Sequence, residues 1–254
     1  MSTIFATVNQ KGGVGKTTTA VNLASYLATF GKKILLIDSD PQGNATSGLG
    51  VDRNDISACM YDVIINGVEF SSIIKPTSIA GLEIAPATAR LAGAEVELTE
   101  MEARESRLKT AVMNLRQNYD YLIIDCPPSL SLLTVNALTA ADQVIIPIQC
   151  EYYALEGLSQ LVKTIELIKK SLNPDLRICG ILLTMYDSRT LLSEQVADET
   201  RQHFGEKVFK TMIPRNVRLA EAPSFGQPIV FYDPSSNGAI AYENLSREIL
   251  DGHI

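Results

Sequence analysis

Short apolar runs alternate with longer amphipathic stretches along most of the chain. The apolar runs are rich in Ile, Leu and Val, which is typical of strands buried on both faces of a parallel sheet. The stretches between them have helical spacing, and the first ends at Gly31, a residue suited to cap a helix. This alternation predicts an α/β fold, a doubly wound, mostly parallel sheet with helices on both faces. We expect strands at residues 3–8, 33–38, 121–125, 143–148 and 177–184, and helices at 17–31, 92–117, 130–141, 154–172, 190–203 and 238–250.

The sequence shows no linker, low-complexity tract or internal repeat, so we expect residues 1–254 to form a single domain. The first expected strand begins almost at once, without the basic and apolar regions of a signal peptide. No apolar stretch approaches the roughly 20 residues of a membrane-spanning helix. The four cysteines include no C-x-x-C pair, which argues against a zinc or iron–sulfur site within one chain. These features predict a cytoplasmic protein. Its formal net charge of −7 argues mildly against nucleic acid or an anionic membrane as a partner.

The stretch QKGGVGKTTT, residues 10–19, lies between the first expected strand and the first expected helix. Strand, glycine-rich loop and helix in this order are the context of a phosphate-binding loop. Glycines let backbone N–H groups approach phosphate oxygens, and the helix directs its positive end at the same anion. We expect Lys16 to neutralise the β- and γ-phosphates of ATP and Thr17 to bind Mg²⁺. The residues expected to hold the nucleotide here are Lys11, Gly12, Gly13, Val14, Gly15, Lys16, Thr17 and Thr18.

A second lysine, Lys11, sets this loop apart from the common G-x-x-x-x-G-K-[ST] pattern, in which Gln10 would be a glycine. The loop resembles the deviant Walker A motif, KGGxGK[ST], of the ParA/MinD superfamily of P-loop ATPases. The resemblance implies that Lys11 reaches the nucleotide of a partner subunit in an ATP-dependent homodimer. There it would stabilise charge in trans, as an arginine finger does.

Two further stretches end in carboxylates. The first, LLIDSDPQGNATSGLG at 35–50, carries Asp38 and Asp40 at the end of a strand, and YDYLIIDCPPS at 119–129 carries Asp125 at the end of another. Parallel sheets bind ligands at these strand ends. The first stretch resembles switch I of the superfamily, which implies that Asp40 orients the attacking water and that Asp38 lies near Mg²⁺. Asp125 matches a Walker B carboxylate beside the metal.

Two weaker resemblances extend the expected nucleotide site. PIQCEYYALEGL, residues 147–158, resembles the segment in which a glutamate, here Glu151, reaches the partner's nucleotide ribose. A glutamate at the start of a helix, near a favourable dipole, is an equally good reading. IPRNVRLAEAPSFGQPI, residues 213–229, resembles the adenine loop, with Pro214 and Asn216 as the candidates for contacting the base.

The resemblance extends from about residue 3 to 250, and two stretches are specific to the chromosomal ParA/Soj branch: DPQGNATSGLG and PRNVRLAEAPSFGQP. It implies an ATPase whose ATP dimer binds double-stranded DNA without sequence preference and is released by a ParB-type partner. The protein would be cytoplasmic and nucleoid-associated. Only two residues precede the first expected strand, so we expect no N-terminal DNA-reading domain of the plasmid type.

Arg189 and Arg218 are the candidate DNA-binding residues. Between Arg177 and Arg218 lie seven Lys/Arg against five Asp/Glu, so this part of the chain is less acidic than the whole. By the resemblance, residues at these positions form a basic surface that dimerisation makes continuous. The alternative is that both arginines are ordinary surface or salt-bridged residues.

Three related functions compete with DNA partitioning. A MinD-like ATPase that cycles on membranes needs a basic amphipathic helix at the C-terminus, which the ending REILDGHI lacks. A ParA-like ATPase that positions another cargo on the nucleoid would be distinguished by gene neighbourhood. A metabolic or metal-cofactor ATPase, such as the nitrogenase iron protein, is disfavoured by the absence of suitably placed cysteines.

Overall fold

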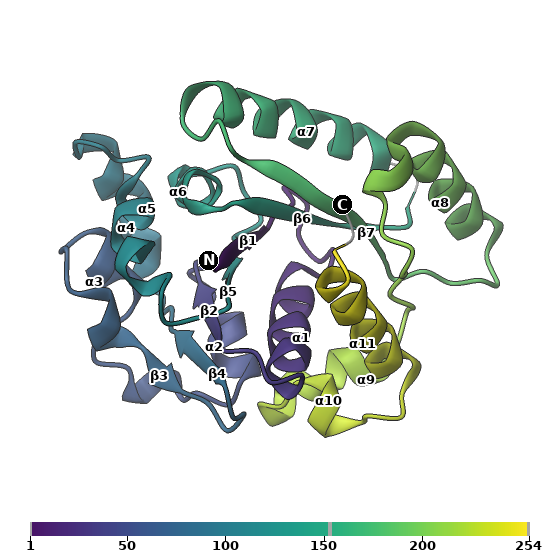
Figure 1. Ribbon diagram of the computed structural model, residues 1–254, viewed down its shortest axis with the longest axis horizontal. Coiled ribbons are helices and arrows are strands. Elements are labelled where there is room, and N and C mark those ends of the chain that lie inside the picture. Colours follow the sequence, from purple (N-terminus) through teal and green to yellow (C-terminus); the bar gives the residue numbers. More distant parts are fainter. Residues whose placement is uncertain (1, 152–153, 253–254) are drawn as a thin grey trace.

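The computed structural model describes residues 2–151 and 154–252. Seven strands form one sheet in the order β3-β4-β2-β5-β1-β6-β7, and only β3 runs antiparallel to its neighbour. Helices cover both faces of this sheet (Figure 1). The strands are β1 (Thr3–Thr7), β2 (Ile34–Asp38), β3 (Lys75–Pro76), β4 (Leu82–Ala85), β5 (Tyr121–Asp125), β6 (Gln143–Gln149) and β7 (Arg177–Thr184). The doubly wound fold predicted from the sequence is confirmed.

Alternating side chains on the strands divide the core into two layers. On β1, Ile4 and Ala6 belong to one cluster of buried residues, and Phe5 belongs to the other. The first layer packs against α3 (Met60–Ile64), α4 (Leu91–Glu97), α5 (Arg107–Val112), α6 (Leu132–Ala140), α7 (Ala154–Ser171) and α8 (Leu191–Phe204). The second packs against α1 (Lys16–Thr29), α2 (Asn44–Gly48), α9 (Val217–Glu221), α10 (Ile229–Tyr232) and α11 (Asn237–Leu250). Neighbouring side chains of a strand point to opposite faces of the sheet. Because β1 lies inside the sheet, its side chains contribute to both layers of the core.

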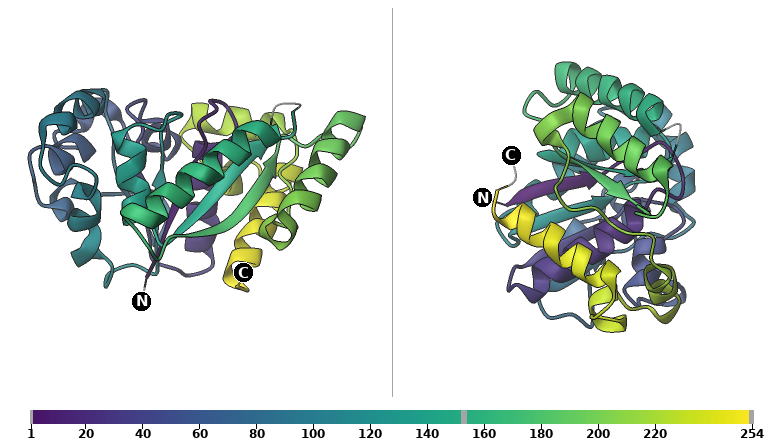
Figure 2. Two further views of the ribbon diagram at one scale, coloured as in Figure 1. Left: turned by 90° about the horizontal axis from the view of Figure 1, so that it is seen from above. Right: turned by 90° about the vertical axis from the view of Figure 1, so that its right-hand side faces the viewer.

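The parallel register places the candidate site residues at one edge of the sheet. Asp38, the last residue of β2, lies opposite Asp125, the last residue of β5, and Thr7 of β1 lies opposite Asp125 on the other side. The loop that follows β1 therefore meets both carboxylates. Figure 2 (left) shows this purple loop at the end of the molecule away from both termini.

The expected single helix at 92–117 is wrong. The structure has α4, a 3₁₀ turn at 98–100, a turn with Ala103 at φ 50°, and then α5. Leu98 and Leu108 are both buried, but ten residues of continuous helix would rotate them about 80° apart. The break returns both to the core. Asn136 of α6 bridges it, because its side chain accepts from the Leu108 N–H and donates to the carbonyl of Arg104.

The cap expected at the end of the first helix is confirmed. Gly31 follows α1 with φ 82°, and its N–H and that of Lys32 donate to carbonyls of the last helical turn, as a glycine cap requires. None of the helices in residues 2–151 and 154–252 is long and apolar enough to cross a membrane.

Candidate nucleotide site

The loop between β1 and α1 is shaped to receive an anion. Gly13 and Gly15 have φ of 75° and 89°, conformations that other residues adopt only with strain. Gly15 is the N-cap of α1 and no side chain caps this helix, so its first N–H groups are available to a ligand. Thr184, the last residue of β7, supports the loop from behind, since its hydroxyl donates to Val14 O at 2.9 Å. This arrangement is typical of a phosphate-binding helix N-terminus.

Lys16 is enclosed by the loop. Its residue is only 6% exposed, and its ammonium group donates to Lys11 O at 3.1 Å. Burial lowers the pKa of Lys16, and the nearby carboxylates of Asp125 and Asp40 oppose this effect. The lysine is thus held between carboxylates and the loop, in the place where phosphate oxygens would complete its contacts.

Asp38 and Asp125 form a buried pair of carboxyl groups. The Oδ2 atom of Asp38 accepts from the hydroxyl of Thr46 at 2.7 Å and from its N–H at 2.8 Å. Burial raises the pKa of Asp38 to about 6, despite these hydrogen bonds. Burial, followed by the charge of Asp38, also raises the pKa of Asp125, and a side-chain hydrogen bond from Thr17 opposes it. Two neighbouring carboxyl groups with raised pKa values favour binding of a cation.

These residues fit Mg²⁺. The Oδ2 atom of Asp125 is buried without a hydrogen-bond partner among the described residues, so this oxygen atom could accept a metal ion. Thr17 and Asp38 supply further oxygen atoms nearby, and Mg²⁺ prefers oxygen ligands. Within residues 2–151 and 154–252 no group of three or more His, Cys, Asp or Glu could hold a metal ion alone. Magnesium is commonly bound through one or two carboxylates together with phosphates and water.

Asp40 lies at the start of the loop after β2, near this pair. Its Oδ1 accepts from the Gln42 N–H at 2.9 Å, and its carbonyl accepts from the Gly43 N–H at 2.9 Å. Gly43 has φ 61°, and a Cβ atom there would lie 2.9 Å from Ala87 O. The turn that holds Asp40 therefore depends on this glycine.

Lys11 does not point into the loop. Its ammonium lies 2.5 Å from Oε2 of Glu151, and the two side chains are 51% and 44% exposed. The structure thus brings together Lys11 and Glu151, the two residues for which the family resemblance implies contact with a partner's nucleotide. It places them against each other in one subunit.

A cavity of about 330 Å³ adjoins the loop and contains both residues expected at the base. Asn216 caps α9, because its Oδ1 accepts from the Arg218 N–H at 2.8 Å. Sequence reasoning missed Thr184 and Met185. Met185 has φ 51°, a strained value that often marks a functional position. The residues lining the cavity include Gly15, Thr18, Thr184, Met185, Pro214 and Asn216.

Arg189 and Arg218 lie on neighbouring segments, because Tyr186 pairs with Pro214. Each already has carboxylate partners. The guanidinium of Arg189 binds both oxygens of Asp187, at 2.9 and 2.7 Å, and holds the pKa of that carboxyl well below its usual range. Arg218 binds Glu221 at 2.9 Å and Asp233 at 3.3 Å. Both guanidinium groups are exposed, but each is paired with carboxylates.

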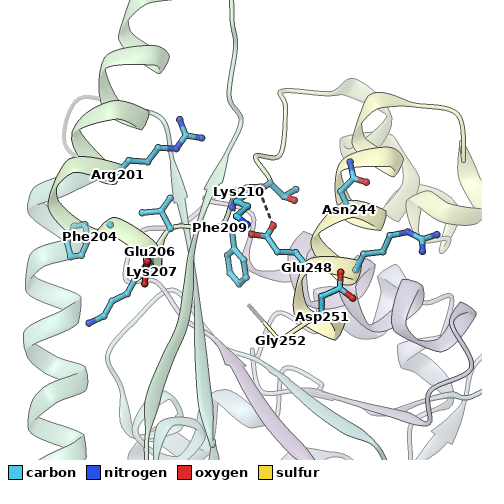
Figure 3. A pocket seen from close by; sticks show the side chains of 14 residues that line it. Arg201, Phe204, Glu206, Lys207, Phe209, Lys210, Asn244, Glu248, Asp251 and Gly252 are labelled. Carbon is cyan, nitrogen blue, oxygen red and sulfur yellow. Dashed lines mark hydrogen bonds between the residues drawn. The ribbon is translucent and has the colours of Figure 1, made fainter. Parts of the chain in front are cut away.

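Another cavity lies away from this site. It has a volume of about 1170 Å³ and lies between the end of α8 and the end of α11 (Figure 3). One of its residues, Arg247, stacks over Phe30 at the end of α1 that is farther from the loop. Glu248 accepts from the N–H groups of Lys210 and Thr211 at 2.7 and 3.0 Å. The side chains that line this cavity carry charges of both signs, and none of them comes from the motifs above.

The chain is similar to known proteins over nearly its whole length. Residues 2–178 match a family model described as an AAA domain. The chain is 59% identical over 249 residues to the sporulation initiation inhibitor protein Soj of Bacillus subtilis, covering 98% of both chains. It is 55% identical to the chromosome partitioning protein ParA of Myxococcus xanthus, covering 97% of this chain and 87% of that one.

Among solved structures, a cobyrinic acid a,c-diamide synthase from Mycobacterium smegmatis, with bound ATP analogue and magnesium, has a TM-score of 0.86 and 38% identity to the chain. The match covers 98% of this chain and 95% of that one. The phosphate-binding loop, the paired carboxylates and full-length identity above 50% lead to one assignment. The chain belongs to the Soj/ParA family of chromosome-partitioning ATPases.

Proposed function

We propose that this ATPase is a switch, in which ATP drives formation of a homodimer that binds double-stranded DNA without sequence preference. A ParB-type partner would stimulate hydrolysis and release the dimer, so that the cycle partitions a chromosome or plasmid in the cytoplasm, on the nucleoid. The proposal is supported by one observation above all. The phosphate-binding loop carries a buried lysine, Lys16, beside the carboxylates and an exposed lysine, Lys11, at its rim.

The inner half of the site would bind and orient the substrate. Lys16 and the first N–H groups of α1 would neutralise the phosphates. Thr17, Asp38 and Asp125 would hold Mg²⁺, which supplies positive charge to the β- and γ-phosphate oxygens. The cavity containing Pro214 and Asn216 would receive the base.

Asp40 would position the attacking water. Its residue is only 6% exposed, and its carboxylate is fixed by the N–H of Gln42, so it is held beside the phosphate loop. Hydrolysis also requires stabilisation of the charge that develops on the transferred phosphoryl group. Lys11, coming from a second subunit, would supply it, and this would link turnover to dimerisation.

DNA binding would use Arg189 and Arg218 of both subunits. Each subunit alone offers few contacts, and the carboxylates of Asp187, Glu221 and Asp233 compete for both arginines. Doubling the contacts in a dimer multiplies the affinity, because phosphate contacts add in free energy. Binding should therefore appear only in the dimeric state.

The deciding experiment is binding of random-sequence duplex DNA with ATP, with ADP and without nucleotide. We expect retention of DNA only with ATP, and a steep fall in affinity as salt rises. Equal binding in all three states would contradict the switch, and absence of binding in all three would contradict the DNA partner.

A MinD-like membrane cycle is the second candidate, and the structure offers it little support. The apolar residues Ala239, Tyr242, Leu245 and Ile249 of α11 are buried in the core, so this face of the helix is occupied within the fold. Flotation with anionic liposomes in the presence of ATP tests this alternative. Positioning of another cargo would retain the same DNA binding and differ in the stimulating partner.

A further inference from the structure

Lys11 and Glu151 are held together by the backbone around them as well as by their charges. The side chain of Asn9 accepts from the Lys11 N–H at 2.9 Å and donates to Pro147 O at 2.7 Å. The start of the loop is thus tied to the last part of β6. Glu151 follows this strand in a tight turn, with its N–H donating to Gln149 O at 2.8 Å. These bonds bring the two residues to one place at the rim of the site.

The two lysines of the loop face different surroundings. Lys16 turns inward and binds the carbonyl oxygen of Lys11, whereas the ammonium of Lys11 meets a carboxylate half exposed to solvent. In this arrangement the positive charge that the proposed dimer would use is neutralised within its own subunit. A partner's nucleotide can receive it only after the ion pair opens.

We propose that Glu151 acts as a lock on Lys11 in the isolated subunit, and that dimerisation exchanges Glu151 for the phosphates of the partner's nucleotide. This inference rests on the proposed role of Lys11 in trans. The exchange favours ATP over ADP, because the γ-phosphate adds negative charge. This charge offsets the loss of the ion pair with the Glu151 carboxylate. The ion pair thereby makes the free energy of dimerisation less favourable. It also makes dimerisation depend on whether ATP or ADP is bound.

The expected size of the effect follows from the exposure of the pair. An exposed ion pair shifts an equilibrium by about 1.4-fold to 5-fold. One pair opens in each subunit, so two open for each dimer. Removing the lock should therefore tighten the dimer by about 2-fold to 25-fold.

The test is Glu151→Gln, which removes the charge and keeps a hydrogen-bonding side chain of the same length. Its matched control is Glu156→Gln, the same change at an exposed position of α7. Sedimentation velocity with a slowly hydrolysed ATP analogue gives the dimer Kd. We expect a 2-fold to 25-fold lower Kd for Glu151→Gln, and wild-type behaviour for Glu156→Gln. The gain should shrink in about 1 M salt, where exposed charges are screened.

An unchanged or weaker dimer for Glu151→Gln overturns the lock, and a weaker one indicates that Glu151 contributes to the dimer itself. A gain that does not depend on salt overturns it as well. Lys11→Ala separates this inference from the proposed function. If Lys11→Ala dimerises like the wild type, the role of Lys11 in trans is wrong. If it fails to dimerise while Glu151→Gln shows no gain, only the lock is wrong.

Discussion

Asp38 and Asp125 end adjacent parallel strands directly opposite each other, and both side chains are fully buried. Two carboxylates in this position repel each other and lose their hydration. The fold maintains them at a cost in stability, which is typical of a site built for a cation rather than for the core.

Without metal, the contribution of Asp38 to the stability of the protein should depend on pH. The folded state raises the pKa of Asp38 from 3.8 to about 6, so the folded protein binds the proton more tightly than the unfolded chain. The contribution of Asp38 is therefore present below pH 4 and is lost as pH rises to about 6. Asp38→Asn should be more stable than the wild type by about 1–3 kcal/mol above pH 6, with the difference vanishing near pH 4.

Urea unfolding in EDTA at pH 4, 5, 6 and 7 measures this difference. Addition of Mg²⁺ and nucleotide should reverse the order, because the variant lacks a charged oxygen near the metal. A gain in stability that is the same at pH 4 and pH 7 would show that the titration of Asp38 is not its cause.

Lys16→Ala should abolish nucleotide binding. The variant removes the lysine that the loop encloses, and the freed space lies beside Asp125 and Asp40, which repel phosphate. Calorimetry with ATP and Mg²⁺ measures the loss, with the exposed Lys109→Ala as the control. Normal hydrolysis by Lys16→Ala would show that the loop is not the phosphate site.

Lys11→Ala should still bind ATP, since its side chain points away from the loop toward Glu151. It should fail to form the ATP-dependent dimer and to hydrolyse. Size-exclusion chromatography with a slowly hydrolysed analogue shows the dimer, and Lys170→Ala on the exposed side of α7 controls for loss of charge.

Asp40→Ala should separate binding from turnover. Loss of a water-positioning carboxylate lowers the rate by roughly 10²–10⁴, while the ATP dimer accumulates and retains DNA binding. Single-turnover hydrolysis and dimer content are measured together, with the exposed Asp55→Ala as the control. If Asp40→Ala hydrolysed ATP at the wild-type rate, the group that positions the attacking water would be another one.

Arg189→Ala and Arg218→Ala should weaken binding to all DNA sequences about equally. Each lost phosphate contact lowers the steepness of the log–log salt dependence by roughly 0.9. Arg177→Ala at the start of β7, remote from Tyr186 and Pro214, is the matched control. Both variants should still form the dimer with ATP. If their DNA affinity and salt dependence were unchanged, the surface carrying Arg189 and Arg218 would not bind DNA.

Much of the fold was predictable because its main signals are local. Each of the five longer strands is a run of buried apolar residues, and the loop carries its own glycines. The strand β4 was missed because it has four residues, one of which is Glu83, and its partner β2 is far away in sequence. The break before α5 was missed for a similar reason, since its bridge, Asn136, comes from another helix.

The sequence motifs identify candidate site residues, but they do not indicate which of these residues contact each other. The motifs identify Lys11 and Glu151, yet no spacing indicates that the two bind each other, because 140 positions separate them. The strained backbone of Met185 was not indicated either. This residue precedes Tyr186, which pairs with residues 213–215, distant in sequence.

The hydrogen bond between Thr19 and Tyr242 has a practical consequence. It joins the first turn of α1 to α11, with 3.1 Å between the two hydroxyl oxygens, and both residues are at most 1% exposed. The residues that line the base cavity also come largely from positions after 183. A fragment cut to residues 2–178, the part that matches the family model, would retain every phosphate and carboxylate motif. It would lack the helix that packs on α1 and the walls that receive a base, so a minimal nucleotide-binding fragment cannot be made by trimming to the motifs.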